Sequence, residues 1–412
     1  MSSSATCRFC NTPLKYIFVD LGMSPLANSY LSMDQNNQME HFFPLRVYVC
    51  EKCFLVQLPE FETPEAIFGD YAYFSSYSDS WLKHAKKYTD YMVGRFGFNA
   101  KSRVIEIASN DGYLLQYFVE KNIPVIGIEP AQNVAEVAQQ CGITTIVKFF
   151  GSKTAEELAG SGAKGDLVVG NNVLAHVPGL NDFVAGLKIV LKDKGVVTME
   201  FPHLMKLMDE NQFDTIYHEH FSYFSFMTVE KIFSYHGLTL FDVQELPTHG
   251  GSLRIFAKHE EDKDKKITEN VVNLRNREKE AGFQHLETYT NFDCKVVAAK
   301  RDLLNFLISA KQEEKSIVGY GAAAKGNTLL NYCGVRQDFV DYVVDRSPHK
   351  QDHLLPGSHI PIYSPDKIQD TKPDYLLILP WNIKKEIMDQ MSYIRNWGGR
   401  FVVPIPSVEV FD

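Results

Sequence analysis

The sequence predicts an α/β protein with three domains: a small cysteine-containing lobe, a Rossmann-like doubly wound sheet and a second Rossmann-like α/β domain. Two CxxC pairs within the first 53 residues indicate the lobe. From residue 103, short apolar runs alternate with helical patterns, and the alternation begins again near residue 316. The chain of 412 residues also exceeds the usual size of one hydrophobic core.

The amino-terminal lobe, residues 1–66, consists of short apolar runs broken by Pro and Gly and is too small to build a good core alone. It carries four of the seven cysteines, in two CxxC pairs about forty residues apart: Cys7, Cys10, Cys50 and Cys53. In a reducing compartment this usage predicts a tetrahedral zinc site rather than disulfides. Because four thiolates leave no open coordination position, we expect the zinc to be structural.

The central domain is predicted over residues 67–250, where an aromatic stretch at 71–77 precedes a helical pattern at 81–96. Its apolar runs are short and nearly continuous, as in buried parallel strands, and amphipathic patterns separate them. The expected strands lie at 104–108, 124–129, 166–172, 195–201, 238–243 and 253–257, with helices at 112–121, 133–140 and 183–191. This series predicts a doubly wound sheet that the last two strands close.

The third domain is predicted over residues 251–412. Residues 259–315 are rich in Glu, Lys, Asp and Asn with helical spacing of apolar residues, so we expect one or two exposed connecting helices. A second α/β series follows, with its runs at 316–327, 341–348, 373–382 and 400–407. The first of these runs includes a Gly-rich turn between a strand and a helix.

Composition and charge restrict the partners. The chain is 45% hydrophobic and 23% charged, as in ordinary globular proteins, and its net charge of -9 argues against a nucleic-acid surface. No apolar run reaches the roughly 18 residues of a membrane span, and no signal segment precedes the lobe. We therefore expect a cytoplasmic protein with a small-molecule substrate, no membrane partner, and an oligomeric state compatible with a monomer.

The turn after the first central strand is acidic. It extends from Glu106 to Gly112 and includes Asn110 and Asp111, where a dinucleotide-binding protein would show GxGxxG. A pyrophosphate would be repelled by these carboxylates. S-adenosylmethionine carries a sulfonium and an ammonium group instead, so the turn favours it electrostatically.

Further polar residues follow the neighbouring strands. Glu129 ends the second strand, from which a carboxylate can bind both ribose hydroxyls. Asn171 and Asn172 end the 166–172 strand, and Phe149 and Phe150 could flank an adenine ring or belong to the core. Helix capping and turn formation are the alternative roles of the polar residues.

The densest polar segment extends from Asp214 to Tyr223 and contains Tyr217, His218, Glu219 and His220. Histidine is the natural general base near neutral pH, with an unperturbed pKa of about 6.5 that needs little tuning. A structural role remains an alternative. A metal role is another, because residues two apart on a strand share a face, but HEH is not the HExxH of zincins.

Two more features could contact a substrate. His176, which follows the strand expected at 166–172, could polarise a substrate oxygen or be a buried histidine with its hydrogen bonds satisfied. In the third domain the turn from Gly319 to Asn327 has the geometry that binds phosphate at a helix amino terminus, with Lys325 as a point charge. A tight turn with a solvated lysine is the alternative.

These motifs together resemble the sugar C-methyltransferases that make branched deoxysugars from nucleotide-linked 4-keto sugars. The resemblance rests on the two CxxC pairs, YFSSYS, EIASNDG, NNVLAHV, IYHEHFSY and GYGAAAKGN, in this order over nearly the whole chain. It implies a zinc-binding lobe, a class I methyltransferase domain that binds S-adenosylmethionine, and a third domain that helps to hold the nucleotide sugar.

The resemblance also implies roles for individual residues. His220 would be the base, and Tyr217 and Glu219 would line the sugar. His176 and Tyr71, or its neighbours Tyr73 and Tyr77, would lie nearby. Further residues expected to contact the substrate, whose nucleotide we expect to be dTDP or GDP, are Tyr77, Tyr223, Tyr320, Lys325 and Asn327.

The chemistry can be argued independently. A carbon next to a ketone is acidic enough for a side-chain base, so His220 would form an enolate that attacks the sulfonium methyl in line, while Tyr217, Glu219 or His176 bonds the enolate oxygen. Two alternatives stay open: an O- or N-methyltransferase of another small molecule, and a non-catalytic nucleotide-sugar binding protein.

Overall fold

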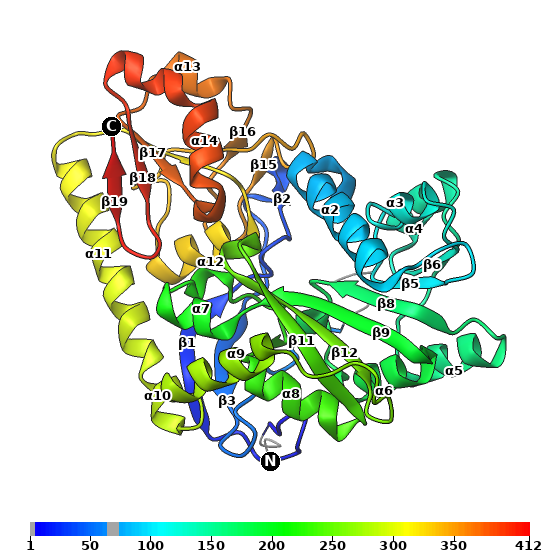
Figure 1. Ribbon diagram of the computed structural model, residues 1–412. Helices are drawn as coiled ribbons and strands as arrows, with labels where there is room; N and C mark the ends of the chain where they lie inside the picture. Colours follow the sequence, from blue (N-terminus) through cyan, green and yellow to red (C-terminus); the bar gives the residue numbers. More distant parts are fainter. Residues whose placement is uncertain (1–4, 64–73) are drawn as a thin grey trace.

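Seven strands form the central sheet of the computed structural model, which describes residues 5–63 and 74–412 (Figure 1). The strand order is β11-β12-β9-β8-β5-β6-β7; β9 to β7 are parallel, and β12 is antiparallel to β9 and β11. The strands are β5 (Val104–Ile107), β6 (Val125–Ile128), β7 (Thr145–Ile146), β8 (Gly165–Asn171), β9 (Leu191–Pro202), β11 (Leu238–Leu246) and β12 (Ser252–His259). The chain reverses its direction of winding between β5 and β8, which is where open α/β sheets bind ligands.

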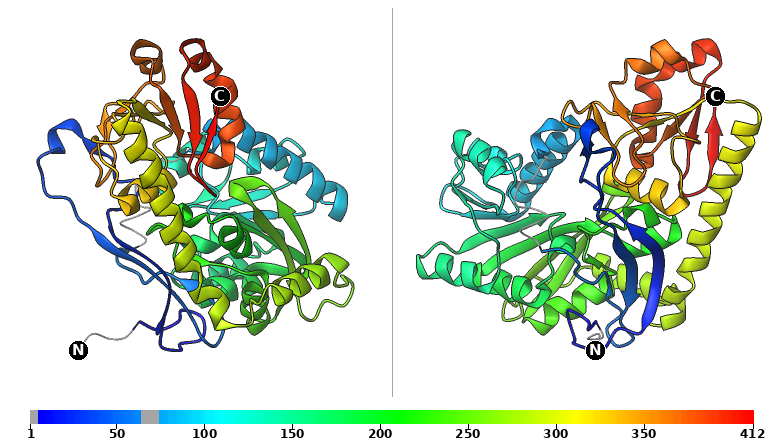
Figure 2. Two further views of the ribbon diagram at one scale, coloured as in Figure 1. Left: turned by 90° about the vertical axis from the view of Figure 1, so that its left-hand side faces the viewer. Right: turned by 180° about the vertical axis from the view of Figure 1, so that it is seen from behind.

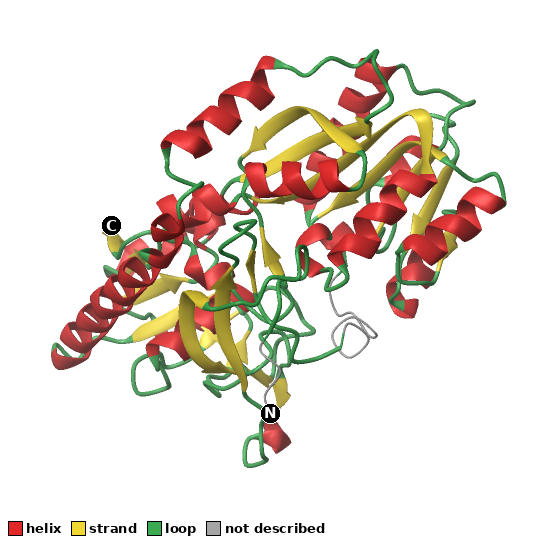
Figure 3. Cartoon of the chain, turned by 90° about the horizontal axis from the view of Figure 1, so that it is seen from below, coloured by secondary structure: helices red, strands yellow, loops and turns green. Residues whose placement is uncertain are grey.

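Helices cover both faces of this sheet, as Figure 3 shows from below. Alternate strand residues divide between two cores: Val104 and Leu167 pack against α2 and α3, and Ile105 and Val168 pack against α5, α6 and α8. The helices are α2 (Asp79–Phe96), α3 (Leu115–Val119), α4 (Gln132–Gln140), α5 (Ser152–Gly160), α6 (Leu180–Val190) and α8 (Phe226–Tyr235). Burial on both faces explains why these strands are continuously apolar. The predicted doubly wound sheet is confirmed.

The amino-terminal lobe does not complete its own sheet. The strand order is β1-β3-β4-β10, all antiparallel, with β1 at Tyr16–Ser24, β3 at Phe43–Val49 and β4 at Val56–Gln57. Its fourth strand, β10 (Ser222–Tyr223), belongs to the polar HEH segment of the central domain. The lobe and this segment are therefore joined by backbone hydrogen bonds.

The carboxy-terminal domain has a six-stranded sheet of order β16-β14-β13-β17-β18-β19, parallel except for β19. This is the strand order of a Rossmann fold, and α12 (Ala324–Cys333) follows its first strand. The strands are β13 (Ile317–Tyr320), β14 (Val343–Val344), β16 (Ile362–Tyr363), β17 (Tyr375–Ile378), β18 (Arg400–Val403) and β19 (Glu409–Phe411). A second Rossmann-like domain was predicted and is confirmed.

Three helices connect the two larger domains: α9 (Glu269–Glu280), α10 (Leu286–Thr290) and α11 (Phe292–Gln312). The prediction of exposed connecting helices is wrong for their inner faces. Val296, Leu303 and Leu307 of α11 are buried in one core with the lobe and the carboxy-terminal domain, and Phe292 stacks on Phe18 of β1 at 4.8 Å. Figure 2 shows α11 alongside the lobe.

Among the helices that the structure describes, none is long and apolar enough to cross a membrane.

Candidate active site

The four cysteines of the lobe converge on one point. Their sulfur atoms all lie within 4.8 Å of one another, with Cys7–Cys53 and Cys10–Cys50 both at 3.5 Å. A tetrahedral zinc with Zn–S bonds of about 2.3 Å places its sulfurs about 3.8 Å apart, so the four thiolates fit zinc. With four cysteine ligands, a tetrahedral zinc has no free coordination position for a substrate.

The two CxxC turns are built alike. The amide of Asn11 donates to the carbonyl of Cys7, and the amide of Phe54 donates to that of Cys50, both at 2.9 Å. Asn11 and Phe54 each adopt the left-handed conformation, with φ of 59° and 63°. This repeat directs both cysteine pairs toward the same ion.

The turn after β5, residues 106–112, is the predicted cofactor cradle. Ala108, Asn110 and Gly112 have positive φ values of 57°, 50° and 80°. Each oxygen of Glu129 accepts one backbone hydrogen bond at 2.9 Å, from the amides of Asn110 and Ala131. Glu129 therefore ties the first turn to the end of β6, and each of its oxygens keeps capacity for a ligand hydroxyl.

Several buried polar atoms around this turn and the end of β8 find no hydrogen-bond partner within the described chain. They are one side-chain oxygen each of Ser109, Asp111, Asn171 and Asn172, and both carboxylate oxygens of Glu106. Unpaired buried polar groups are costly, so a polar ligand is expected here.

Charge identifies that ligand. Burial, and then the nearby charges of Asp111 and Glu129, raise the pKa of Glu106, although the Tyr113 hydroxyl opposes the shift. Burial likewise raises the pKa of Glu129. A cation relieves this crowding of carboxylates and an anion aggravates it, so the cradle fits S-adenosylmethionine and not a dinucleotide.

Aromatic residues flank the cradle. Trp81 of α2 lies over Tyr113 with ring centroids 6.0 Å apart. Phe149 is 41% exposed and can contact a ligand, whereas Phe150 packs edge-on against Phe183 at 5.4 Å. Of the two phenylalanines, only Phe149 has a side chain exposed enough to contact a ligand, and Phe150 belongs to the core.

The aromatic stretch before α2 reaches the same turn. The amides of Ser75 and Ser76 donate to the side chains of Asn110 and Asp111, at 2.9 and 3.0 Å. Tyr77 is 74% exposed and stacks on Phe74. The predicted residue Tyr71, like Tyr73, lies outside the described residues.

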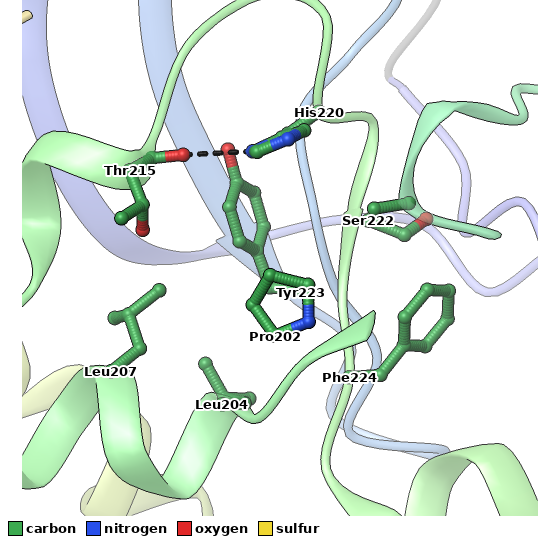
Figure 4. A pocket seen from close by; sticks show the side chains of 9 residues that line it. Pro202, Leu204, Leu207, Thr215, His220, Ser222, Tyr223 and Phe224 are labelled. Atoms are coloured by element: carbon green, nitrogen blue, oxygen red, sulfur yellow. Dashed lines mark hydrogen bonds between the residues drawn. The ribbon is translucent and has the colours of Figure 1, made fainter. Parts of the chain in front are cut away.

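His220 is oriented by a backbone carbonyl. Its Nδ1 lies 2.8 Å from the carbonyl oxygen of Thr215 (Figure 4). Because a carbonyl can only accept, Nδ1 carries the proton and Nε2 keeps its lone pair. The His220 ring lies 4.1 Å from that of Tyr217 and 4.7 Å from that of His176. These three predicted residues come together.

A small apolar cavity lies beside His220. Its volume of about 10 Å³ is room for one water, and Leu204, Leu207 and Tyr223 are among the residues that line it (Figure 4). Burial in these surroundings lowers the pKa of His220 to about 4. The sequence-based expectation of an untuned imidazole is therefore wrong: His220 is neutral at pH 7 but is a weaker base than free histidine.

The other members of the HEH segment point to the lobe. Nε2 of His218 lies 3.3 Å from the carbonyl oxygen of Pro44 in β3. The side chain of Asn28 donates to Glu219 at 2.5 Å, and burial raises the pKa of Glu219 to about 7. The contact of Asn28 could not be predicted, because no local pattern brings residue 28 to residue 219.

The residues predicted to bind phosphate separate in space. Lys325 Nζ donates to Asn382 at 2.7 Å and lies 4.6 Å above the ring of Trp381. Asn327 is buried within the packing of α12, and the Tyr320 hydroxyl faces Gln390 at 3.3 Å. Of the three, only Lys325 faces the central domain, where its charge lowers the pKa of His220.

The Gly-rich turn has partners that the sequence did not reveal. The amide of Ala322 donates to Asp345 at 2.8 Å, and its carbonyl accepts from Tyr30 at 2.6 Å and from Lys350 at 2.8 Å. Asp345 directly follows β14, as Glu129 directly follows β6. This shared position of a carboxylate after the second strand of each sheet could have identified Asp345 from the sequence. Tyr30 belongs to the lobe, so the lobe and the carboxy-terminal domain meet at this turn.

Known proteins share this organisation. The chain is similar to the C-methyltransferase NovU of Streptomyces niveus, with 35% identity over 406 residues that cover 98% of this chain and 96% of that protein. Three family models match: a putative zinc binding domain at 7–68, a methyltransferase domain at 81–243 and a C-methyltransferase C-terminal domain at 247–406.

More distant similarities are shorter. A ubiquinone biosynthesis O-methyltransferase of Bartonella bacilliformis is 29% identical over 99 residues, which cover 23% of this chain and 39% of that protein. The solved structure of the PH0226 protein from Pyrococcus horikoshii has 14% identity and a TM-score of 0.37, and covers 48% of this chain and 99% of its own.

The fold and the cradle define an S-adenosylmethionine-dependent methyltransferase with a zinc-binding domain. With a relative of 35% identity along nearly its whole length, the chain belongs to the C-methyltransferase family that includes NovU.

Proposed function

We propose that the chain methylates the carbon next to the ketone of a nucleotide-linked 4-keto deoxysugar, with dTDP or GDP as the nucleotide. The observation that carries this proposal is the lone pair on Nε2 of His220, fixed by the hydrogen bond from Nδ1 to Thr215. Transfer to carbon requires a carbanion-like nucleophile, and a ketone makes the neighbouring C–H acidic enough for such a base.

The bound cofactor supplies an electrophilic methyl group on a sulfonium. Glu129 would bind the ribose hydroxyls, Asn171 and Asn172 would offer polar groups at the end of β8, and Phe149 would contact the adenine. The unpaired oxygens at the ends of β5 and β8 support this orientation.

His220 Nε2 removes the proton next to the ketone, and the electron pair of that C–H bond moves onto the ketone oxygen as an enolate. Glu219, whose pKa is raised to about 7, can donate a hydrogen bond to this oxygen in its protonated form, because Asn28 occupies only one of its two oxygens. Tyr217 and His176 complete the polar surroundings. Their preorganised donors stabilise charge where it develops.

The carboxy-terminal domain holds the nucleotide in this proposal. The amino terminus of α12 has no side-chain cap, so its backbone amides can bind a diphosphate. Lys325 and Lys350 add positive charge on the two sides of the turn. A role in substrate binding has less support for Tyr77 and Tyr223. Tyr77 is largely exposed, and Tyr223 is buried beside His220.

The test is incubation with a donor labelled in its methyl group and a panel of dTDP- and GDP-linked 4-keto sugars, with NMR of the product. A new C-methyl signal is expected, and His220→Asn should nearly abolish it. A methyl signal on oxygen or nitrogen would indicate the alternative methyltransferase class. Binding of a nucleotide sugar without turnover by the wild type would indicate a binding protein.

A further inference from the structure

The turn between β11 and β12 contains a strained histidine. This turn is the short helix η5 (Thr248–Gly250), and His249 within it has φ 55° and ψ 21°, the left-handed conformation. Only a few per cent of residues other than glycine adopt this conformation, and histidine is among the residues that do so more often. Such outliers persist where the surrounding structure imposes them, commonly at functional sites.

The surroundings impose the conformation from several sides. A Cβ on Gly250 would lie 2.5 Å from the Trp381 ring, and one on Gly251 would lie 2.9 Å from Lys206. The side chain of Gln212 donates to the carbonyl of Gly250 at 2.7 Å. The turn therefore has little freedom to shift, and the position of the His249 ring is fixed.

The ring of His249 extends to the cofactor cradle. Its Nε2 lies 3.0 Å from the side-chain nitrogen of Asn172, and its ring lies edge-on to Trp81 at 5.4 Å. The side chain is exposed. An accessible ring that contacts both Asn172 and Trp81 stands at the edge of the cradle, where a ligand can reach it.

The same turn contacts the segment that carries His220. The Trp381 ring, which packs against Gly250, donates to Asp214 at 2.7 Å, and the backbone carbonyl of Gln212 accepts from the Thr215 hydroxyl at 2.8 Å. The Thr215 carbonyl in turn orients His220. Asn172, the partner of His249, precedes His176 by four residues, and the His176 ring lies 4.7 Å from that of His220. The turn of His249 is therefore joined to both segments that border the proposed base.

We propose that His249 is a further catalytic residue, which donates a hydrogen bond from Nδ1 to the ketone oxygen of the acceptor. The amide nitrogen of Asn172 donates to Nε2, so the ring proton lies on Nδ1. This inference rests on the proposed function. As His220 takes the proton from carbon, the electron pair moves onto the ketone oxygen, and the neutral imidazole N–H stabilises that charge without itself losing the proton.

The test uses His249→Gly, because glycine removes the ring and relieves the strained φ. The variant should fold with an unchanged or higher melting temperature. Exchange of the proton next to the ketone in heavy water, with S-adenosylhomocysteine bound, should fall by about 10²- to 10³-fold, as for loss of one oxyanion donor. The affinity for S-adenosylmethionine, measured by calorimetry, should change less than about threefold.

His359→Gly is the matched control. His359 is also a left-handed histidine, with φ 53°, but it bonds Asn36 and Glu40 at the boundary between the lobe and the carboxy-terminal domain. Its proton-exchange rate should equal that of the wild type. Normal exchange in His249→Gly, or a loss confined to cofactor affinity, would overturn the proposal.

A spectroscopic measurement separates this proposal from the proposed function. Histidine ¹⁵N spectra of the wild type, with the His249 signal assigned by its loss in the variant, should show the proton on Nδ1. A proton on Nε2 would overturn the role of His249 whatever the substrate. Conversely, a wild type that exchanges no proton on any keto sugar would refute the proposed function, while the ¹⁵N signal still decides the tautomer.

Discussion

Replacing His220 with Asn removes the proposed base and keeps a side chain of similar size. Loss of a general base lowers rates by about 10²- to 10⁴-fold, so kcat should fall within this range while cofactor affinity is retained. His285→Asn is the matched control, because His285 is exposed and precedes α10 without a side-chain cap bond. Its kcat should equal that of the wild type.

The pH dependence gives a sharper test. The surroundings lower the pKa of His220 from 6.5 to about 4, and at about 1.4 kcal/mol per unit they disfavour the imidazolium by about 3 kcal/mol. A base must be unprotonated, so the acid limb of kcat/KM should lie near pH 4 rather than 6.5. Glu219 acts in its protonated form, so the rate should fall again above its pKa of about 7.

The assay is kcat/KM between about pH 3.5 and 9 for the wild type, His220→Asn and Glu219→Gln, at about half-unit steps. Glu219→Gln should lose the alkaline limb and keep the plateau. An acid limb near 7 that disappears in Glu219→Gln, together with near-normal turnover of His220→Asn, would refute this assignment and make Glu219 the base.

Three further predictions concern the other sites. Cys50→Ser should lower the zinc content in metal analysis and also kcat, because β4 pairs with β10; Cys294→Ser, at an exposed cysteine, should change neither. Glu129→Ala should weaken S-adenosylmethionine binding by about 1.5–3 kcal/mol in calorimetry, whereas detectable NAD binding in place of the methyl donor would contradict the cradle. Lys325→Ala should raise KM for the nucleotide sugar more than it changes cofactor affinity, and equal effects would point to a folding role.

The sequence predicted the parts of the molecule that local patterns encode. The CxxC spacing located the zinc ligands, and the alternation of apolar runs and helices predicted both Rossmann-like sheets. The acidic turn from Glu106 also predicted the type of cofactor. In each case residues close in sequence determine the chemistry.

Features that depend on distant contacts could not be predicted. The composition of residues 259–315 is polar on average, which conceals the single apolar stripe by which α11 joins the core. Asn28 reaches Glu219 across 191 positions of sequence. The pKa of His220 depends on burial by leucines of another helix, and the left-handed φ of His249 depends on what packs against the two glycines after it.

The segment from Phe213 to Tyr223 of the central domain is held by contacts from both outer domains. The lobe contributes the pairing of β4 with β10 and the bond from Asn28 to Glu219. The carboxy-terminal domain contributes the bonds from Trp381 to Asp214, at 2.7 Å, and from Thr328 to the carbonyl of Ile216, at 3.0 Å. The carbonyl of Thr215, which orients His220, lies between these last two anchors. The orientation of His220 is therefore tied to the packing of the carboxy-terminal domain as well as to the central sheet.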